Sequence, residues 1–75
     1  MPKFNGYKNW NHWNVSLWIN NDEGLYQKAR SAVMGRSRTA AAVMLIEDLR
    51  DHGTTHTPDG APYSLSSVRA AMVGM

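Results

Sequence analysis

Apolar residues recur at the spacing of an α-helix in three stretches of the chain. Residues 22–34, residues 38–52 and a short segment after Ser64 each repeat hydrophobic positions three or four residues apart. The first two stretches are followed by Gly35 and Gly53, which fit the left-handed position after a helix. The pattern predicts three amphipathic helices, the first over 22–34 and the second over 38–52.

The apolar faces of these helices predict the core and the polar residues before them predict the caps. Asn20 or Asn21 is expected to cap the first helix, Ser37 or Thr39 the second, and Ser64 the third. The predicted core positions are Leu25, Ala29, Ala32, Val33, Ala42, Leu45, Ile46, Leu49, Leu65, Val68, Ala71 and Met72.

Residues 10–19 fit two patterns. Valine, leucine and isoleucine at positions 15, 17 and 19 alternate as in a strand, whereas the tryptophans and leucine at 10, 13, 17 and 18 have helical spacing. The length of the stretch and the capping residue Asn9 favour a helix. Trp10, Trp13 and Leu17 then form the stripe expected to anchor the bundle. At least one tryptophan should keep an exposed ring edge.

These elements predict an all-α fold, a compact bundle of about four short helices. Residues 1–8 form an N-terminal arm, and residues 54–62, TTHTPDGAP, form a loop with a Pro-Asp-Gly turn. The chain has 75 residues, so we expect a single domain over 1–75. A core of this size provides only a few kcal/mol of net stability.

Composition excludes several classes of protein. The chain has no cysteine, which removes disulfide scaffolds, thiol nucleophiles and the common structural zinc sites. Residues 40–46, AAAVMLI, form the longest apolar run and are too few to span a membrane, and the N-terminus lacks the pattern of a signal peptide. We therefore expect no metal, no cofactor and no membrane, and a location in the cytoplasm.

Candidate catalytic residues are sparse. His52 and His56 are separated by a glycine and a loop, and no third metal ligand adjoins them. His12 and Ser16 lie one helical turn apart, but no acid stands nearby to orient the histidine. Scattered glycines form no phosphate-binding loop. The sequence predicts that the protein is not an enzyme.

Basic residues cluster between positions 28 and 38, where Lys28, Arg30, Arg36 and Arg38 occur without an intervening acid. One interpretation is a solvated face, because charged side chains are mostly exposed. A second is a contact edge for a partner, since arginine is enriched at interfaces. A third is a helix-turn-helix module in which residues 36–39 read bases.

The segment from Tyr7 to Tyr26 resembles a family of small proteins carried by bacteriophages, prophages and plasmids. The shared pattern is Y-K-N-x-x-x-W-N-V-x-L-W-I-x-N-D-E-x-L-Y, and many members are known only as a domain of unknown function. The turn from Thr57 to Gly60 is also similar. The resemblance implies a context of mobile genetic elements, in which small cysteine-free proteins commonly inhibit host systems.

This resemblance implies a non-enzymatic inhibitor of a host defence system in the cytoplasm of the host cell. The class to which it points is the anti-CRISPR proteins, here one that binds a type I surveillance complex and blocks target DNA binding. The expected partner-binding residues are Lys28, Arg30, Arg36, Arg38, Trp10 and Trp18. The net charge of +2 disfavours DNA mimicry. The alternative is a small DNA-binding or regulatory module that uses the cluster at 28–38.

Overall fold

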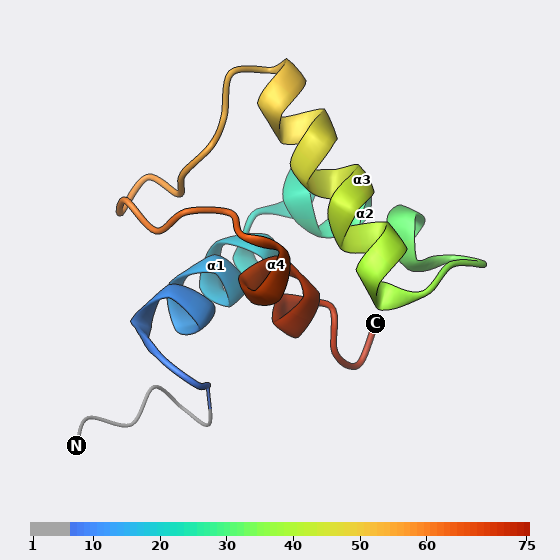
Figure 1. Ribbon diagram of the computed structural model, residues 1–75, viewed down its shortest axis with the longest axis horizontal. Helices are drawn as coiled ribbons and strands as arrows, with labels where there is room; N and C mark the ends of the chain where they lie inside the picture. Colours follow the sequence, from blue (N-terminus) through green and yellow to red (C-terminus); the bar gives the residue numbers. More distant parts are fainter. Residues whose placement is uncertain (1–6) are drawn as a thin grey trace.

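Four α-helices make up most of the protein (Figure 1), for which a computed structural model describes residues 7–75. They are α1 (Trp10–Asn21), α2 (Glu23–Val33), α3 (Arg38–Asp51) and α4 (Leu65–Ala71). The described residues contain no strand, so the predicted all-α bundle is confirmed and residues 10–19 are helical. Most of the predicted N-terminal arm lies outside the described residues.

Each helix packs against two others. α1 contacts α2 and α4, and α3 contacts the same two helices from the other side (Figure 1). The four helices therefore enclose one shared hydrophobic core. Its side chains are Val15, Ile19, Ala29, Ala32, Ala41, Ala42, Leu45, Leu49, Ala61, Tyr63, Val68, Ala71 and Met72.

Small residues dominate this core, and six of its thirteen members are alanines. Alanine adds little side-chain bulk, so the helix backbones can approach closely. The predicted faces of α2 and α3 are confirmed, with Leu25, Val33 and Ile46 partly buried against the core. Val68 and Ala71 on α4, and Met72 directly after it, are buried as predicted, but Leu65 is exposed and that prediction was wrong.

The buried face of α1 differs from the prediction. Val15 and Ile19 are fully buried, whereas Trp10 and Leu17 are each 38% exposed. The stripe of Trp10, Trp13 and Leu17 is therefore not the anchor of the bundle. α1 carries apolar side chains around most of its circumference, so periodicity alone could not select the face that packs. The expectation that a tryptophan remains exposed is confirmed by Trp10.

Side-chain caps define where the helices begin. Asn9, Ser37 and Ser64 cap α1, α3 and α4 as predicted. The cap of α2 is Asp22, whose carboxylate accepts a hydrogen bond from the Leu25 backbone, and not Asn20 or Asn21. Those two asparagines lie inside α1, because α1 continues to within one residue of α2. Gly35 and Gly53 take positive φ after α2 and α3, as expected.

Backbone hydrogen bonds within the connection between α3 and α4 hold it in one conformation. The Gly60 amide donates to the Thr57 carbonyl, which closes a turn with proline and aspartate at its centre. The Thr57 amide donates to the Ala61 carbonyl and the Tyr63 amide to the Thr55 carbonyl. The segment therefore folds back on itself, and Ala61 and Tyr63 enter the core.

Candidate functional site

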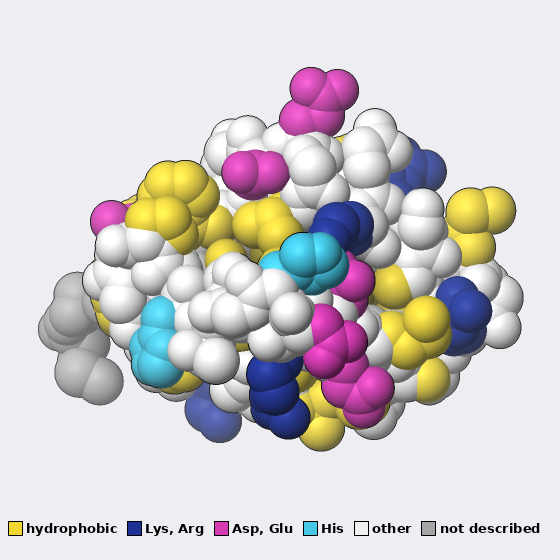
Figure 2. Space-filling model, turned by 90° about the horizontal axis from the view of Figure 1, so that it is seen from above, with side chains coloured by type: hydrophobic (Ala, Val, Ile, Leu, Met, Phe, Trp, Pro, Cys, Tyr) yellow, Lys and Arg dark blue, Asp and Glu magenta, His cyan; other side chains and the backbone are white. Residues whose placement is uncertain are grey.

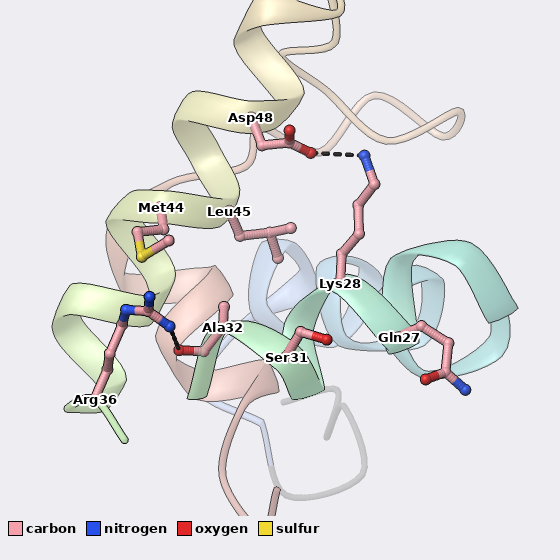
Figure 3. A pocket seen from close by; sticks show the side chains of 8 residues that line it. All are labelled: Gln27, Lys28, Ser31, Ala32, Arg36, Met44, Leu45 and Asp48. Atoms are coloured by element: carbon pink, nitrogen blue, oxygen red, sulfur yellow. Dashed lines mark hydrogen bonds and ion pairs between the residues drawn. The ribbon is translucent and has the colours of Figure 1, made fainter. Parts of the chain in front are cut away.

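A groove of about 540 Å³ lies between α2 and α3 (Figure 3). Ala32 and Leu45, both buried, belong to its lining, and Met44 adds an apolar side chain that is 44% exposed. Lys28, Arg36 and Asp48 supply charged groups around this apolar part. The groove thus combines an apolar surface with charged ends, which is the usual composition of a site that binds another molecule.

An ion pair lies at one end of the groove. The Lys28 ammonium lies 2.6 Å from a carboxylate oxygen of Asp48 and links α2 to α3 (Figure 3). The hydrogen bond from Lys28 lowers the pKa of Asp48, and the nearby positive charge acts in the same direction. Both side chains are nearly half exposed, so the pair contributes little to stability. The charges at this end largely cancel.

The cation at the other end of the groove, Arg36, has no carboxylate partner within residues 7–75. Arg36, in the turn between α2 and α3, donates one hydrogen bond of 3.2 Å to the Ala32 carbonyl in the last turn of α2. The other donors of its guanidinium make no hydrogen bond within residues 7–75, and Figure 3 shows the guanidinium beside Met44. An arginine has five donors, so this side chain can still bind an anion with two parallel hydrogen bonds.

Arg30 and Arg38 do not line the groove. Arg30 lies over the Tyr26 ring, 5.8 Å from its centroid, and is held on α2. Arg38 is the first residue of α3, and its exposed side chain forms no hydrogen bond or ion pair within the described range. Of the predicted basic cluster, only Lys28 and Arg36 therefore line the groove between α2 and α3.

The predicted aromatic contacts belong to α1. Trp10, its first residue, keeps an exposed edge. Trp18 is half-buried, and its indole nitrogen donates a 2.9 Å hydrogen bond to Asp59 in the loop before α4. Neither tryptophan lines the groove between α2 and α3. The structure thus divides the six predicted contact residues among separate places on the surface.

Charge is mixed on the face of the molecule drawn in Figure 2. In the face drawn in Figure 2, lysine and arginine side chains lie next to aspartate and glutamate, and apolar patches interrupt them. No broad field of a single sign covers this face. This face therefore lacks the extended basic stripe that follows a nucleic-acid backbone.

Sequence reasoning missed a polar network that joins α1 to the loop before α4. The side-chain amide of Asn14 donates a hydrogen bond to the Asp59 carboxylate. The Thr57 hydroxyl donates to the side-chain oxygen of Asn14 and accepts from the backbone amide of Ala61. Asn14 and Thr57 are buried, and each has hydrogen-bond partners. The Thr-Pro-Asp-Gly turn was a signal for the loop, but nothing local indicated that it would reach Asn14.

The histidines make contacts that the sequence did not predict. His12 Nε2 lies 2.6 Å from the Ser66 hydroxyl on α4, whereas Ser16 is paired with the Tyr7 hydroxyl at 2.7 Å. His52, the residue directly after α3, contacts the Asp48 backbone carbonyl in the last turn of that helix. Within residues 7–75, no three histidine, aspartate or glutamate side chains converge as a metal site would require. No helix in that range combines the length and apolar character needed to cross a membrane.

These features define a small all-α protein with an amphipathic groove between α2 and α3 that has an ion pair at one end. The chain belongs to a family of unknown function, DUF7249, whose pattern it matches over residues 1–75. No curated protein and no solved structure matches the chain.

Proposed function

We propose that this protein is a non-enzymatic inhibitor, encoded by a mobile genetic element, that binds a host defence complex. The complex is a type I CRISPR surveillance complex, and occupation of its surface prevents target DNA from binding. The observation that carries the proposal is the groove between α2 and α3, where Met44 and Arg36 remain accessible. The resemblance of residues 7–26 to proteins of phages and plasmids supplies the biological context.

The position of Arg38 supports a binding role for the cations near this groove. Arg38 is the first residue of α3, where the helix dipole disfavours positive charge, and the first turn has no acid. No partner within the described residues compensates for that charge. Residues that oppose the local stability rules without compensation are expected at functional surfaces.

The absence of catalysis is part of the proposal. His12 contacts the Ser66 hydroxyl, yet no carboxylate among the described residues hydrogen-bonds to this histidine to orient it. A nucleophile–base pair normally needs such a third group. Inhibition is therefore expected to be stoichiometric, with no product formed from the target.

The test is a titration of the purified chain against type I surveillance complexes loaded with guide RNA. Binding of a labelled target duplex to each complex is measured as the chain is added. We expect one complex to lose duplex binding at about one chain per binding site, because a non-enzymatic inhibitor must occupy its target. Complete inhibition by far fewer chains would indicate catalysis, and inhibition of no complex would refute the proposed target.

Charge reversal at Arg36 and Arg38 tests whether these two residues contact the partner. Arg36→Glu combined with Arg38→Glu should weaken binding by roughly 2 kcal/mol, about 30-fold, while the free energy of unfolding changes by no more than about 1 kcal/mol. Lys8→Glu combined with Arg69→Glu is the matched control, since both side chains are exposed and lie outside the groove. Equal loss in the two double variants would indicate a general charge effect.

The DNA-binding alternative makes an opposite prediction. A module that uses residues 28–38 on phosphates should bind bare duplex with an affinity that falls steeply as salt increases. The proposed inhibitor should bind the protein complex tightly and bare duplex weakly. Affinity for both is therefore measured at two salt concentrations in the same buffer.

A further inference from the structure

The groove between α2 and α3 is asymmetric in charge along its length. At one end Lys28 and Asp48 neutralise each other through their ion pair. At the other end the guanidinium of Arg36 uses one hydrogen bond and has no carboxylate partner within residues 7–75. Between them lie the apolar side chains of Leu45 and Met44. A ligand that matches this arrangement needs an apolar group in the middle and an anion at the Arg36 end.

We propose that the groove binds an acidic amphipathic helix of the partner protein. This inference rests on the proposed function, namely that the chain acts by binding a protein. One apolar side chain of the partner helix packs on Met44 and Leu45, and an adjacent glutamate or aspartate pairs with Arg36. The partner helix lies along the seam between α2 and α3, where its residues at i, i+3 and i+4 present one face.

The apolar part of the groove favours a protein segment over a nucleic acid. A phosphate backbone is contacted by cations and polar donors and gains nothing from Met44 and Leu45. Lys28 and Asp48 neutralise each other, so Arg36 is the cation of the groove lining that has no carboxylate partner within residues 7–75. Successive phosphates of a strand therefore meet no row of cations in the groove, whereas a helix can direct a single carboxylate toward Arg36.

Methionine is suited to this role. Its unbranched, flexible side chain adapts to different apolar partners, and methionine is frequent on surfaces that bind amphipathic helices. Met44 is 44% exposed on the groove, whereas Met34 is 75% exposed but does not line it. The chain therefore contains a reporter inside the proposed contact and a matched reporter outside it.

The experiment uses the full chain with labelled methionine methyl groups, observed by NMR. The probe is a synthetic peptide of about twelve residues, long enough for three helical turns, with leucine on one face and glutamate on the other. We expect the Met44 signal to shift in a saturable manner while the Met34 signal stays in place. No shift of Met44 at millimolar peptide would overturn the proposal.

Variants then test the two ends of the groove separately. Arg36→Gln should weaken binding of the glutamate peptide about tenfold, because it removes the carboxylate partner. Lys28→Gln should change binding less than threefold, since Lys28 is already paired with Asp48. Met44→Gln should weaken binding at least fivefold, while Met34→Gln leaves it unchanged. Equal effects of the two methionine variants would contradict the groove as the contact.

Two further ligands complete the test. A peptide with lysine in place of glutamate and a short duplex DNA should both fail to shift Met44, and binding of either as tight as that of the glutamate peptide would overturn the inference. This titration contains no defence complex, so it is independent of the test of function. Peptide binding without inhibition refutes the proposed function alone. Inhibition that survives Arg36→Gln and Met44→Gln refutes the groove alone.

Discussion

Asn14, in the middle of α1, donates a 2.9 Å hydrogen bond to the Asp59 carboxylate, which lies 45 residues later in the chain. The same Asp59 oxygen accepts from the Trp18 indole, one helical turn further along α1. Two side chains of α1 thus hold the tip of the turn before α4. The residues Asn14 and Trp18 within the W-N-V-x-L-W stretch therefore have a structural role, which is separate from the groove between α2 and α3.

Removing Asn14 should destabilise the protein. Asn14→Ala leaves the Thr57 hydroxyl and the Asp59 carboxylate without their amide partner and creates a space in a buried position. We expect a loss of about 2 kcal/mol in the free energy of unfolding. Asn11→Ala is the control, because Asn11 is exposed on the same helix and makes no side-chain hydrogen bond within the described residues. Urea denaturation measures both, and equal losses would show that the network is unimportant.

The same network should make stability depend on pH. Hydrogen bonds from Asn14, and then from Trp18, lower the pKa of Asp59. An acid whose pKa is lower in the folded state adds stability that is complete above the unfolded pKa of about 3.9. That stability is lost as pH falls through the folded pKa, because the unfolded chain takes up the proton first.

The pH effect can be separated from that of Asp48, whose pKa is also lowered, mainly by the hydrogen bond from Lys28. Asp59→Asn should be less stable than the wild type near neutral pH, and the difference should shrink as pH falls below about 4. Asp48→Asn keeps the Asp59 contribution and serves as the comparison. Melting curves from pH 7 to pH 2 report the difference. Parallel curves for wild type and Asp59→Asn would contradict the assignment to Asp59.

The corrected face of α1 gives a third prediction. Ile19 is fully buried among the helices, so Ile19→Ala should cost about 3 kcal/mol and leave little folded protein. Leu17 is 38% exposed, so Leu17→Ala should cost less than about 1 kcal/mol. If the stripe of Trp10, Trp13 and Leu17 were the anchor, the order would be reversed. Thermal melts of the two variants decide between the faces.

Local signals made the helices predictable from the sequence. Ser37 and Ser64 cap because their side chains reach backbone amides three residues on, and Gly53 ends a helix because it adopts a positive φ. The face of α1 was not predictable in this way. Its burial is decided by how α1 packs against α2 and α4, which periodicity within α1 does not record.

The candidate site was predictable only in part. The run from Lys28 to Arg38 indicated that cations gather around one turn, and Lys28 and Arg36 do line one groove. The sequence did not show that Asp48, twenty residues after Lys28, would neutralise it, nor that Met44 would lie beside Arg36. Those relationships depend on how α2 packs against α3, which is a tertiary property.

The two ends of α3 provide the last prediction. Arg38 is its first residue and Arg50 lies in its last turn, and both side chains are exposed. The helix dipole disfavours a cation at the first position and favours one at the last. Arg38→Glu should therefore raise the free energy of unfolding by about 0.3–1 kcal/mol, and Arg50→Glu should lower it by a similar amount. Arginine and glutamate have nearly equal helix propensity, so the charge is the main difference.

Urea denaturation at low ionic strength measures both changes, and high salt should reduce both, because exposed charges are screened. A stabilised Arg38→Glu that also binds its target more weakly would show that Arg38 serves binding at the expense of the helix. Stabilisation with unchanged binding would instead mean that Arg38 is a solvated charge, and the contact would then rest on Arg36 and Met44. Destabilisation by Arg38→Glu would contradict the dipole argument, because no hydrogen bond or ion pair of Arg38 within residues 7–75 is lost.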